Sequence, residues 1–266
     1  MQKSKVDMSF STNSHNYGQL QEIDRPFSED VLLETVDSTQ TYARREYKRQ
    51  YYNQITFIRA LHQTEGRGQF DRKWECQSKK NILTTIIFPF FTRIEQLKNV
   101  TSVVGYTIVK LYKELYNLNA QLKWMNDILI NCQKSVGILV ESEQIDNKYV
   151  LFVGIGINVN WCTQGATSLK ENLGKEVDQN QLYLLLKERV IKALYDLNDF
   201  GFEYLRVRMN KILYKRGQLC EFVDSKTLQK VYSGILEGLN EQGDLVIRDK
   251  VNYQRAIVGL NVRLKV

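Results

Sequence analysis

The hydrophobic and polar positions of this chain follow two different periods. Short runs rich in β-branched and aromatic residues predict strands, whereas apolar residues spaced three and four apart predict helices. The strand-like runs in the first part of the chain are "VLLETV", "ITFIRALHQ", "NILTTIIFPF", "AQLKWMNDILI", "KSVGILVESEQI" and "YVLFVGIGINVN". We expect the third run to stop at Pro89, because proline donates no hydrogen bond to a sheet. Only short polar turns separate the last three runs, which predicts three consecutive strands in an antiparallel or mixed sheet.

Helical patterns occur between and after these runs. Asp37 and Ser38 are good N-cap residues in front of a charged segment, so a helix is expected there. Apolar residues recur at helical spacing from Leu97 onward, and again over residues 179–214. Since helices and strands are mixed without a strict βαβ alternation, the pattern predicts an α+β fold.

The same patterns divide the chain of 266 residues into three parts. Residues 1–30 are polar and aperiodic, which is typical of a loosely attached N-terminal arm. Residues 31–215 carry the mixed pattern of the main domain. Residues 216–266 hold only short strand-like runs separated by glycines and polar turns, so we predict a small C-terminal β-barrel there.

Composition narrows the function only a little. The chain has 37 Lys and Arg against 30 Asp and Glu, and the resulting charge of +7 suits nucleic acid, nucleotide phosphates or an acidic protein partner equally well. There is no CxxC pair and no partner histidine is evident for any cysteine, so the sequence suggests neither a zinc site nor a catalytic thiol. No signal peptide or membrane-spanning run is evident, and we expect a cytoplasmic protein that does not bind a membrane.

The segment "GRGQFDR", residues 66–72, combines glycines with positive charge directly after a predicted strand. It has the composition of a phosphate-binding loop, but it matches neither the GxxxxGK[ST] nor the GxGxxG spacing. We expect Arg67, Arg72 and Lys73 to repel one another, so that the loop would become ordered only around an anion. A solvated basic hairpin turn is an equally good interpretation of the composition.

Four segments together resemble the signatures of biotin protein ligases, and they occur in the order of that family. They are "VDSTQ" at 36–40, "QTEGRGQFDRKWECQSKKNIL" at 63–83, "KWMNDILINCQKSVGILVESE" from 123, and "GIGINVN" at 154–160. The resemblance is to the form without an N-terminal DNA-binding domain, since the arm before residue 31 is too short and aperiodic for a helix-turn-helix module. We therefore expect no DNA binding.

The resemblance implies a fold and a reaction. The fold would be a mixed sheet flanked by helices, as in the related lipoate ligases, with a small C-terminal β-barrel. Biotin and ATP with Mg²⁺ would give biotinyl-5′-AMP, and a lysine of a biotin carrier domain, such as that of acetyl-CoA carboxylase, would then attack this intermediate. The metal ligands, the carboxylase and the state of dimerisation are left open.

The resemblance also implies roles for single residues. The predicted catalytic residues are Lys134 and Arg67, whose charge would offset that of the reacting carboxylate and phosphate. The first three of the predicted biotin-binding residues would hydrogen-bond the ureido ring, and Gln63 would lie near the carboxylate end of biotin. The full set is Ser38, Thr39, Gln40, Gln63, Arg67, Gly68, Gln69, Lys134, Gly137 and Leu139. The predicted ATP-binding residues, with the tryptophan stacked on adenine, are Arg72, Trp74, Lys123, Asn126, Asp127 and Asn158.

The chain departs from the family's signatures in two places. Gln69 and Asp71 stand where the family usually has further arginine and glycine, and Met125 replaces the usual proline. A loop with fewer anion contacts should hold biotinyl-AMP less tightly, so we predict an intermediate of shorter lifetime. A lipoate or octanoate ligase on the same fold, and a biotin-binding protein without catalysis, are the alternative functions.

Overall fold

The computed structural model describes residues 28–51, 53–70, 72–249, 255–257 and 262–265. The predicted N-terminal arm therefore lies outside the described residues except for its last three. These residues open the first strand, β1 (Ser28–Val36), which begins earlier than the run "VLLETV" suggests.

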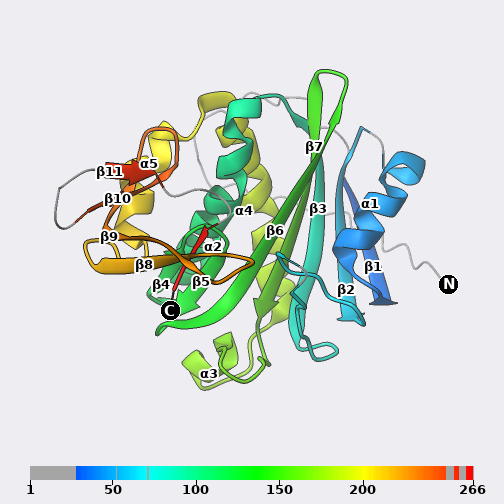
Figure 1. Cartoon of the computed structure of the whole chain (residues 1–266). Coiled ribbons are helices and arrows are strands. Elements are labelled where there is room, and N and C mark those ends of the chain that lie inside the picture. Colours follow the sequence, from blue (N-terminus) through cyan, green and yellow to red (C-terminus); the bar gives the residue numbers. More distant parts are fainter. Residues whose placement is uncertain (1–27, 52, 71, 250–254, 258–261, 266) are drawn as a thin grey trace, which may run out of the picture.

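A seven-stranded mixed sheet forms the centre of the molecule, as the α+β prediction required (Figure 1). Its order is β1-β2-β3-β7-β6-β5-β4, with β1 and β2 parallel and every other neighbouring pair antiparallel. The strands after β1 are β2 (Ile55–Gln63), β3 (Asn81–Phe91), β4 (Ala120–Lys123), β5 (Asp127–Ile130), β6 (Gln133–Ile145) and β7 (Lys148–Asn158).

Two expectations about these strands are wrong. Pro89 does not end β3, which continues to Phe91, because the register with β7 shifts between Phe88 and Phe91 and the proline sits inside this irregularity. The run over residues 120–130 is not one strand. It folds back at 124–126 into the β4–β5 hairpin, so four strands, β4 to β7, stand where three were predicted.

Helices cover both faces of the sheet. α1 (Thr39–Gln50) starts at Ser38, whose Oγ accepts a hydrogen bond from the Gln40 amide, as the N-cap prediction required. α2 (Val100–Tyr116) and α4 (Gln179–Phe200) lie on the opposite face. The alternation along β7 shows the division: Val153 and Ile155 belong to the large core under α2 and α4, whereas Phe152 packs with α1.

The two long helical patterns are each divided in the structure. A 3₁₀ helix, η1 (Ile94–Asn99), precedes α2. The helix predicted over 179–214 breaks at Gly201, where φ is +75°, and continues as α5 (Glu203–Ile212). The short α3 (Leu169–Leu173), with a capping box at Ser168, was not predicted.

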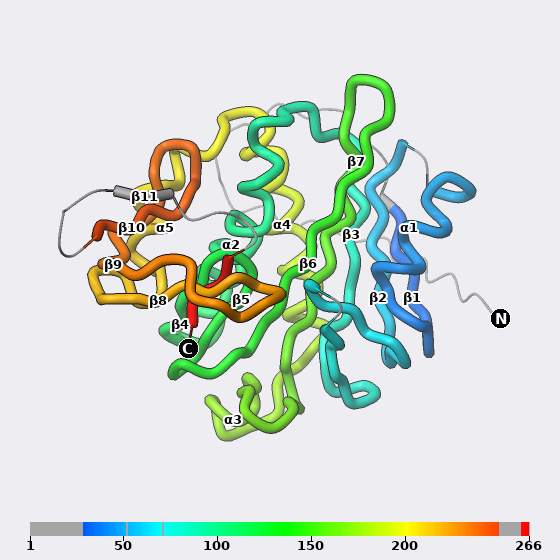
Figure 2. The backbone as a smooth tube through the Cα atoms, in the orientation of Figure 1, coloured from blue at the N-terminus to red at the C-terminus, as the bar shows by residue number. Residues whose placement is uncertain are grey.

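The C-terminal part forms a separate antiparallel sheet of order β11-β10-β9-β8-β12 beside α5 and the β4–β5 edge of the large sheet (Figure 2). Its strands are β8 (Leu219–Asp224), β9 (Lys230–Leu239), β10 (Leu245–Arg248), β11 (Arg255–Ile257) and β12 (Val262–Leu264). A second, β-rich unit is thereby confirmed. Among the described residues no pairing joins β11 to β12 to close the predicted barrel. The boundary at residue 215 stays a prediction, because the apolar side chains of both sheets share one core.

None of the helices within the described residues is long and apolar enough to cross a membrane.

Candidate ligand-binding site

A hollow lies on the α1 face of the large sheet, where glycines replace side chains. Gly137 on β6 pairs with Gly156 on β7, and Leu139 pairs with Gly154. Because residues two apart on a strand share a face, Gly154 and Gly156 point to the same side as Phe152, which packs with α1. Because glycine has no side chain, β6 and β7 leave open space here and form the floor of a pocket.

The pocket brings together residues that are far apart in the sequence. All the predicted biotin-binding residues line it, as do both predicted catalytic residues and, of the predicted ATP-binding residues, Arg72, Trp74 and Asn126. Lys123, Asp127 and Asn158 are not among the lining residues. The lining residues that were not predicted are Lys73, Leu83, Thr84, Thr85, Ile138, Gly154, Ile155 and Gly156.

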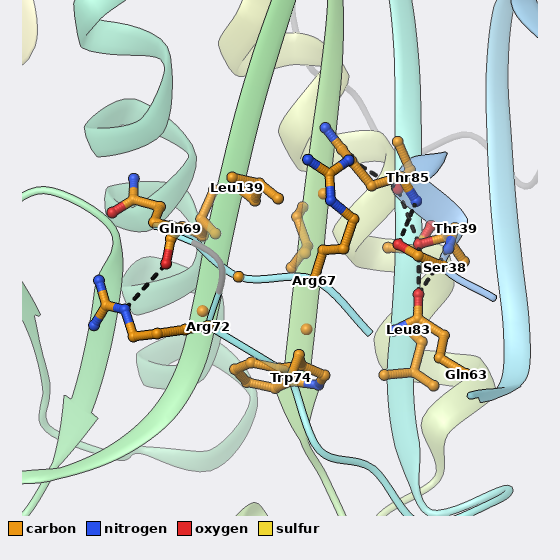
Figure 3. A pocket seen from close by; sticks show the side chains of 18 of the residues that line it. Ser38, Thr39, Gln63, Arg67, Gln69, Arg72, Trp74, Leu83, Thr85 and Leu139 are labelled. Atoms are coloured by element: carbon orange, nitrogen blue, oxygen red, sulfur yellow. Dashed lines mark hydrogen bonds between the residues drawn. The ribbon is translucent and has the colours of Figure 1, made fainter. Parts of the chain in front are cut away.

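The side chains divide into two groups (Figure 3). Ser38, Thr39, Gln63 and Thr85 lie together on one side, Gln69 and Arg72 lie on the other, and Arg67 and Trp74 stand between them. One side of the pocket is therefore built from hydroxyls and amides, and positive charge increases toward the other.

The glycine-arginine segment forms a small hairpin with its own backbone hydrogen bonds. The amide of Trp74 donates to the carbonyl of Gly66 at 2.8 Å, and the amide of Gly68 donates to the carbonyl of Arg72 at 2.7 Å. A Cβ on Gly66 would lie 2.4 Å from the carbonyl oxygen of Trp74. The glycine thus permits close approach of two chain segments. These contacts agree with the hairpin interpretation of the described backbone. The expectation that the loop becomes ordered only around an anion stays a prediction.

The indole of Trp74 lies on the glycine floor. A Cβ added to Gly137 would come within 2.6 Å of the indole, and one added to Gly156 within 2.4 Å. The ammonium of Lys134 lies 5.4 Å from the centre of the same ring, a cation–π distance. Since the indole Nε1 is buried and has no hydrogen-bond partner within the described part of the chain, it remains available as a donor. Stacking of this ring on adenine stays a prediction.

Cations gather around Asp127 at one end of the pocket. Lys134 forms an ion pair with Asp127 at 2.7 Å. Burial lowers the pKa of Lys123, and the nearby charges of Lys134, Arg263 and Arg72 lower that pKa further, while Asp127 opposes them. Arg263 comes from β12 of the C-terminal sheet, and nothing in its sequence context had pointed to this neighbourhood.

Two predicted polar residues, Asn158 and Asn126, make contacts that support strand β6. The buried Asn158 donates from Nδ2 to the carbonyl of Thr167 at 3.2 Å and, more weakly, to that of Lys134 at 3.4 Å. Asn126 binds Ile138 on β6, because its carbonyl accepts from the Ile138 amide at 2.9 Å. Both contacts fix the strand that carries Lys134, and a direct contact of Asn158 with nucleotide stays a prediction.

One cysteine does have a histidine neighbour, contrary to the expectation from sequence. The Sγ of Cys76 lies 3.9 Å from Nδ1 of His62, and it also contacts the carbonyl of Gln63. Burial raises the pKa of the Cys76 thiol, which therefore stays protonated. This disfavours a nucleophilic role for Cys76.

Fold and site define an α+β protein whose pocket joins a group of neutral hydrogen-bonding side chains to a group of cations. The pattern of the biotin/lipoate A/B protein ligase family matches residues 32–158. Over this region and in the relatives described next, the chain is similar to the biotin protein ligases of that family.

Two curated relatives illustrate the similarity. The chain is 28% identical over 210 residues to the biotin–[acetyl-CoA-carboxylase] ligase of Paracoccus denitrificans, covering 74% of this chain and 86% of that protein. It is 26% identical over 201 residues to the bifunctional ligase/repressor BirA of Bacillus subtilis, covering 72% of this chain. The match spans only 61% of the length of that Bacillus protein.

A solved structure agrees over almost the whole chain. The biotin protein ligase from Aquifex aeolicus in complex with biotin and ATP superposes with a TM-score of 0.73 at 26% identity, covering 90% of this chain and 99% of that one. The agreement includes the C-terminal part as well as the region matched by the family pattern.

Proposed function

We propose that this chain is a biotin–[biotin carboxyl carrier protein] ligase. It activates biotin with ATP to biotinyl-5′-AMP and transfers the biotinyl group to a lysine of the carrier domain of a biotin-dependent carboxylase, such as acetyl-CoA carboxylase. The observation that carries the proposal is the single pocket that collects all the predicted biotin-binding residues next to Arg67 and Lys134. The Paracoccus relative named for this activity and the Aquifex structure with biotin and ATP support it.

The cations of the pocket suit the chemistry of both steps. In the first step a carboxylate oxygen of biotin attacks the α-phosphorus of ATP and pyrophosphate leaves. The two reactants are anions, so positive charge at Arg67 and Lys134 offsets their repulsion and stabilises the charge on the phosphorus. In the second step the amine of the carrier lysine attacks the acyl carbon and AMP leaves, so this chain needs no nucleophile of its own.

ATP is the proposed cofactor, and Mg²⁺ would accompany it. Among the described residues no cluster of three or more His, Cys, Asp or Glu side chains forms a metal cage. Mg²⁺ in nucleotide sites is held largely by phosphates with one or two carboxylates. Asp127, adjacent to Asn126 and paired with Lys134, is the carboxylate we propose for that part. A cytoplasmic location and the absence of DNA binding stay predictions.

The alternatives can be separated by heat stability. A ligase binds both substrates, so biotin with ATP should raise the unfolding temperature more than biotin alone. A biotin-binding protein without catalysis would respond to biotin only. A lipoate or octanoate ligase would respond to those acids in preference to biotin.

The decisive experiment incubates the protein with ATP, radiolabelled biotin and a carrier domain. We expect label on the carrier with the wild type and none above background with Lys134→Ala. Lys148→Ala is the matched control, because Lys148 is exposed at the start of β7, at the β6–β7 turn, and is absent from the pocket lining. Label transfer that is unchanged in Lys134→Ala would contradict the assigned role, and no transfer by the wild type would contradict the function.

A further inference from the structure

Glu141 contacts two residues that line the pocket, Gln40 and Arg67, although no role followed for it from the sequence. It lies on β6, two residues beyond Leu139 and therefore on the α1 face of the sheet. Its Oε2 accepts from Nε2 of Gln40 at 2.9 Å, and its Oε1 accepts from Nη2 of Arg67 at 3.1 Å. The same carboxylate forms a longer ion pair with Arg44 of α1, at 3.7 Å.

These contacts allow only one orientation of the Gln40 side-chain amide. Its Nε2 donates to Glu141 and also to the backbone carbonyl of Phe152 at 3.0 Å. A carboxylate and a carbonyl can only accept, so the NH₂ group must face them and the oxygen must face the other way. Both hydrogens of Nε2 are then used within the protein. Only Oε1 of Gln40 is left for a ligand.

The oxygen of Gln40 retains acceptor capacity. It lies 3.2 Å from the hydroxyl of Thr85, but that hydroxyl has one hydrogen and is also 2.9 Å from the hydroxyl of Thr39. A Cβ on Gly154 would lie 2.7 Å from this oxygen, so the glycine leaves room for it over the pocket floor. Gln40 therefore presents an acceptor.

Gln63, expected near the carboxylate end of biotin, lies beside Thr39 instead and presents the opposite polarity to Gln40. Its Oε1 accepts from both the backbone amide and the hydroxyl of Thr39, at 2.7 and 3.1 Å. The amide oxygen of Gln63 is thus bound, and its NH₂ group is the part left to donate. The pocket offers an acceptor from one glutamine and a donor from the other. A cyclic urea, which has N–H donors and a carbonyl acceptor, matches this pair, whereas an alkyl chain or a dithiolane ring does not.

We propose that Glu141 is a positioning residue that determines ligand specificity: by fixing the amide of Gln40 it makes the pocket select a ring that carries an N–H donor. The inference rests on the proposed function and adds the residue that sets the preference for biotin over lipoate or octanoate. Through its other oxygen the same carboxylate holds Arg67 of the hairpin beside this recognition end.

The test compares substitutions of Glu141 by measuring biotin binding without ATP in a calorimeter. Glu141→Leu removes the acceptor and lets the Gln40 amide turn, and we expect the Kd for biotin to rise about tenfold or more, as when a site loses a hydrogen bond that its ligand requires. Glu141→Gln keeps an oxygen for Gln40 but loses the charge beside Arg67. We expect this conservative variant to stay within about threefold of the wild type.

Glu143→Leu is the matched control. Glu143 lies two residues further along the same face of β6 and pairs with Lys48 at 2.6 Å, outside the pocket. It should leave the biotin Kd unchanged. The proposal is overturned if Glu141→Leu behaves like Glu143→Leu, or if Glu141→Gln loses as much affinity as Glu141→Leu, since the effect would then arise from the charge near Arg67.

If Glu141→Leu does not fold, a second variant tests the same proposal. Gln40→Leu removes the acceptor itself, and we expect the same loss of biotin affinity, with the double variant losing no more than either single one. Additive losses, or an unchanged Kd in Gln40→Leu, would overturn the proposal. Failure of the wild type to bind biotin would instead contradict the proposed function.

Discussion

At the scale of single residues, the contact between Trp74 and the glycine floor leads to a sharp prediction. In Gly156→Ala the new Cβ would lie 2.4 Å from the indole, so the ring must move away from the sheet. We expect a loss of about 1–3 kcal/mol in the free energy of unfolding, as for other overpacked sites, together with weaker biotin binding. Denaturant titration and calorimetry measure the two effects.

The control for this substitution is a double variant. Trp74→Ala removes the ring that the new methyl group meets, so adding Gly156→Ala to it should cost little further stability. If Gly156→Ala destabilises the Trp74→Ala background as much as the wild type, the contact with the indole is not the cause.

Cys162 provides a prediction about pH. Burial, followed by the hydrogen bond to Glu171, raises the pKa of this thiol to about 11. A raised pKa means that the protonated thiol stabilises the folded state below the ordinary thiol pKa, and that this contribution is lost as the pH rises through about 11. At pH 8 only about one thiol in a thousand would be ionised. Iodoacetamide should therefore label the exposed Cys132 well before Cys162, and equal rates in the folded protein would disprove this.

At the scale of elements, we expect the hairpin formed by residues 66–70 and 72–74 to affect how tightly the intermediate is held. Gln69 stands where the family usually has arginine, and the side chain of Arg72 donates to the carbonyl of Gln69 at 3.0 Å. The Arg72 side chain is thus engaged by the backbone of the hairpin itself, and position 69 carries no positive charge. We expect Gln69→Arg to slow the release of biotinyl-AMP about tenfold, since a charge-assisted hydrogen bond is added.

Burst measurements of adenylate release test this prediction. Gln144→Arg adds the same charge at an exposed position near the end of β6 and should change nothing. A wild-type protein that already retains its intermediate tightly would refute the prediction.

Comparison of the predicted helices and strands with the observed ones shows which features the sequence could predict. The β-branched run of β2 and the cap at Ser38 were predicted correctly because their signals are local. The break after α4 and the β4–β5 hairpin were missed, because a helical or strand-like pattern does not show where the chain turns. The predicted biotin-binding residues, all of which line the pocket, come from contiguous signatures in the sequence. Glu141 was missed because its importance depends on which face of β6 lies beside α1, a tertiary property.

At the scale of the whole molecule, the C-terminal sheet is fixed to the main α+β part and places a positive charge near Lys123. Lys98 of η1 forms an ion pair with Asp244, and Oδ1 of Asn210 in α5 accepts from the Leu239 amide at 2.7 Å. Apolar side chains of both parts share one core. The position of β12 relative to the pocket is therefore determined by packing, and Arg263 is held where its charge lowers the pKa of Lys123.

This arrangement predicts that the C-terminal sheet takes part in nucleotide binding. Arg263→Ala should weaken ATP binding about threefold to tenfold, because one cation is lost from the group around Asp127, and the difference should shrink at high salt. Biotin binding without ATP should not change, since Arg263 is absent from the lining of the pocket that holds the predicted biotin-binding residues. Lys265→Ala is the matched control: Lys265 lies two residues further on and pairs with Glu221 at 3.1 Å. If both variants bind ATP like the wild type, the charge of Arg263 acts on Lys123 alone and the C-terminal sheet has no part in holding the nucleotide.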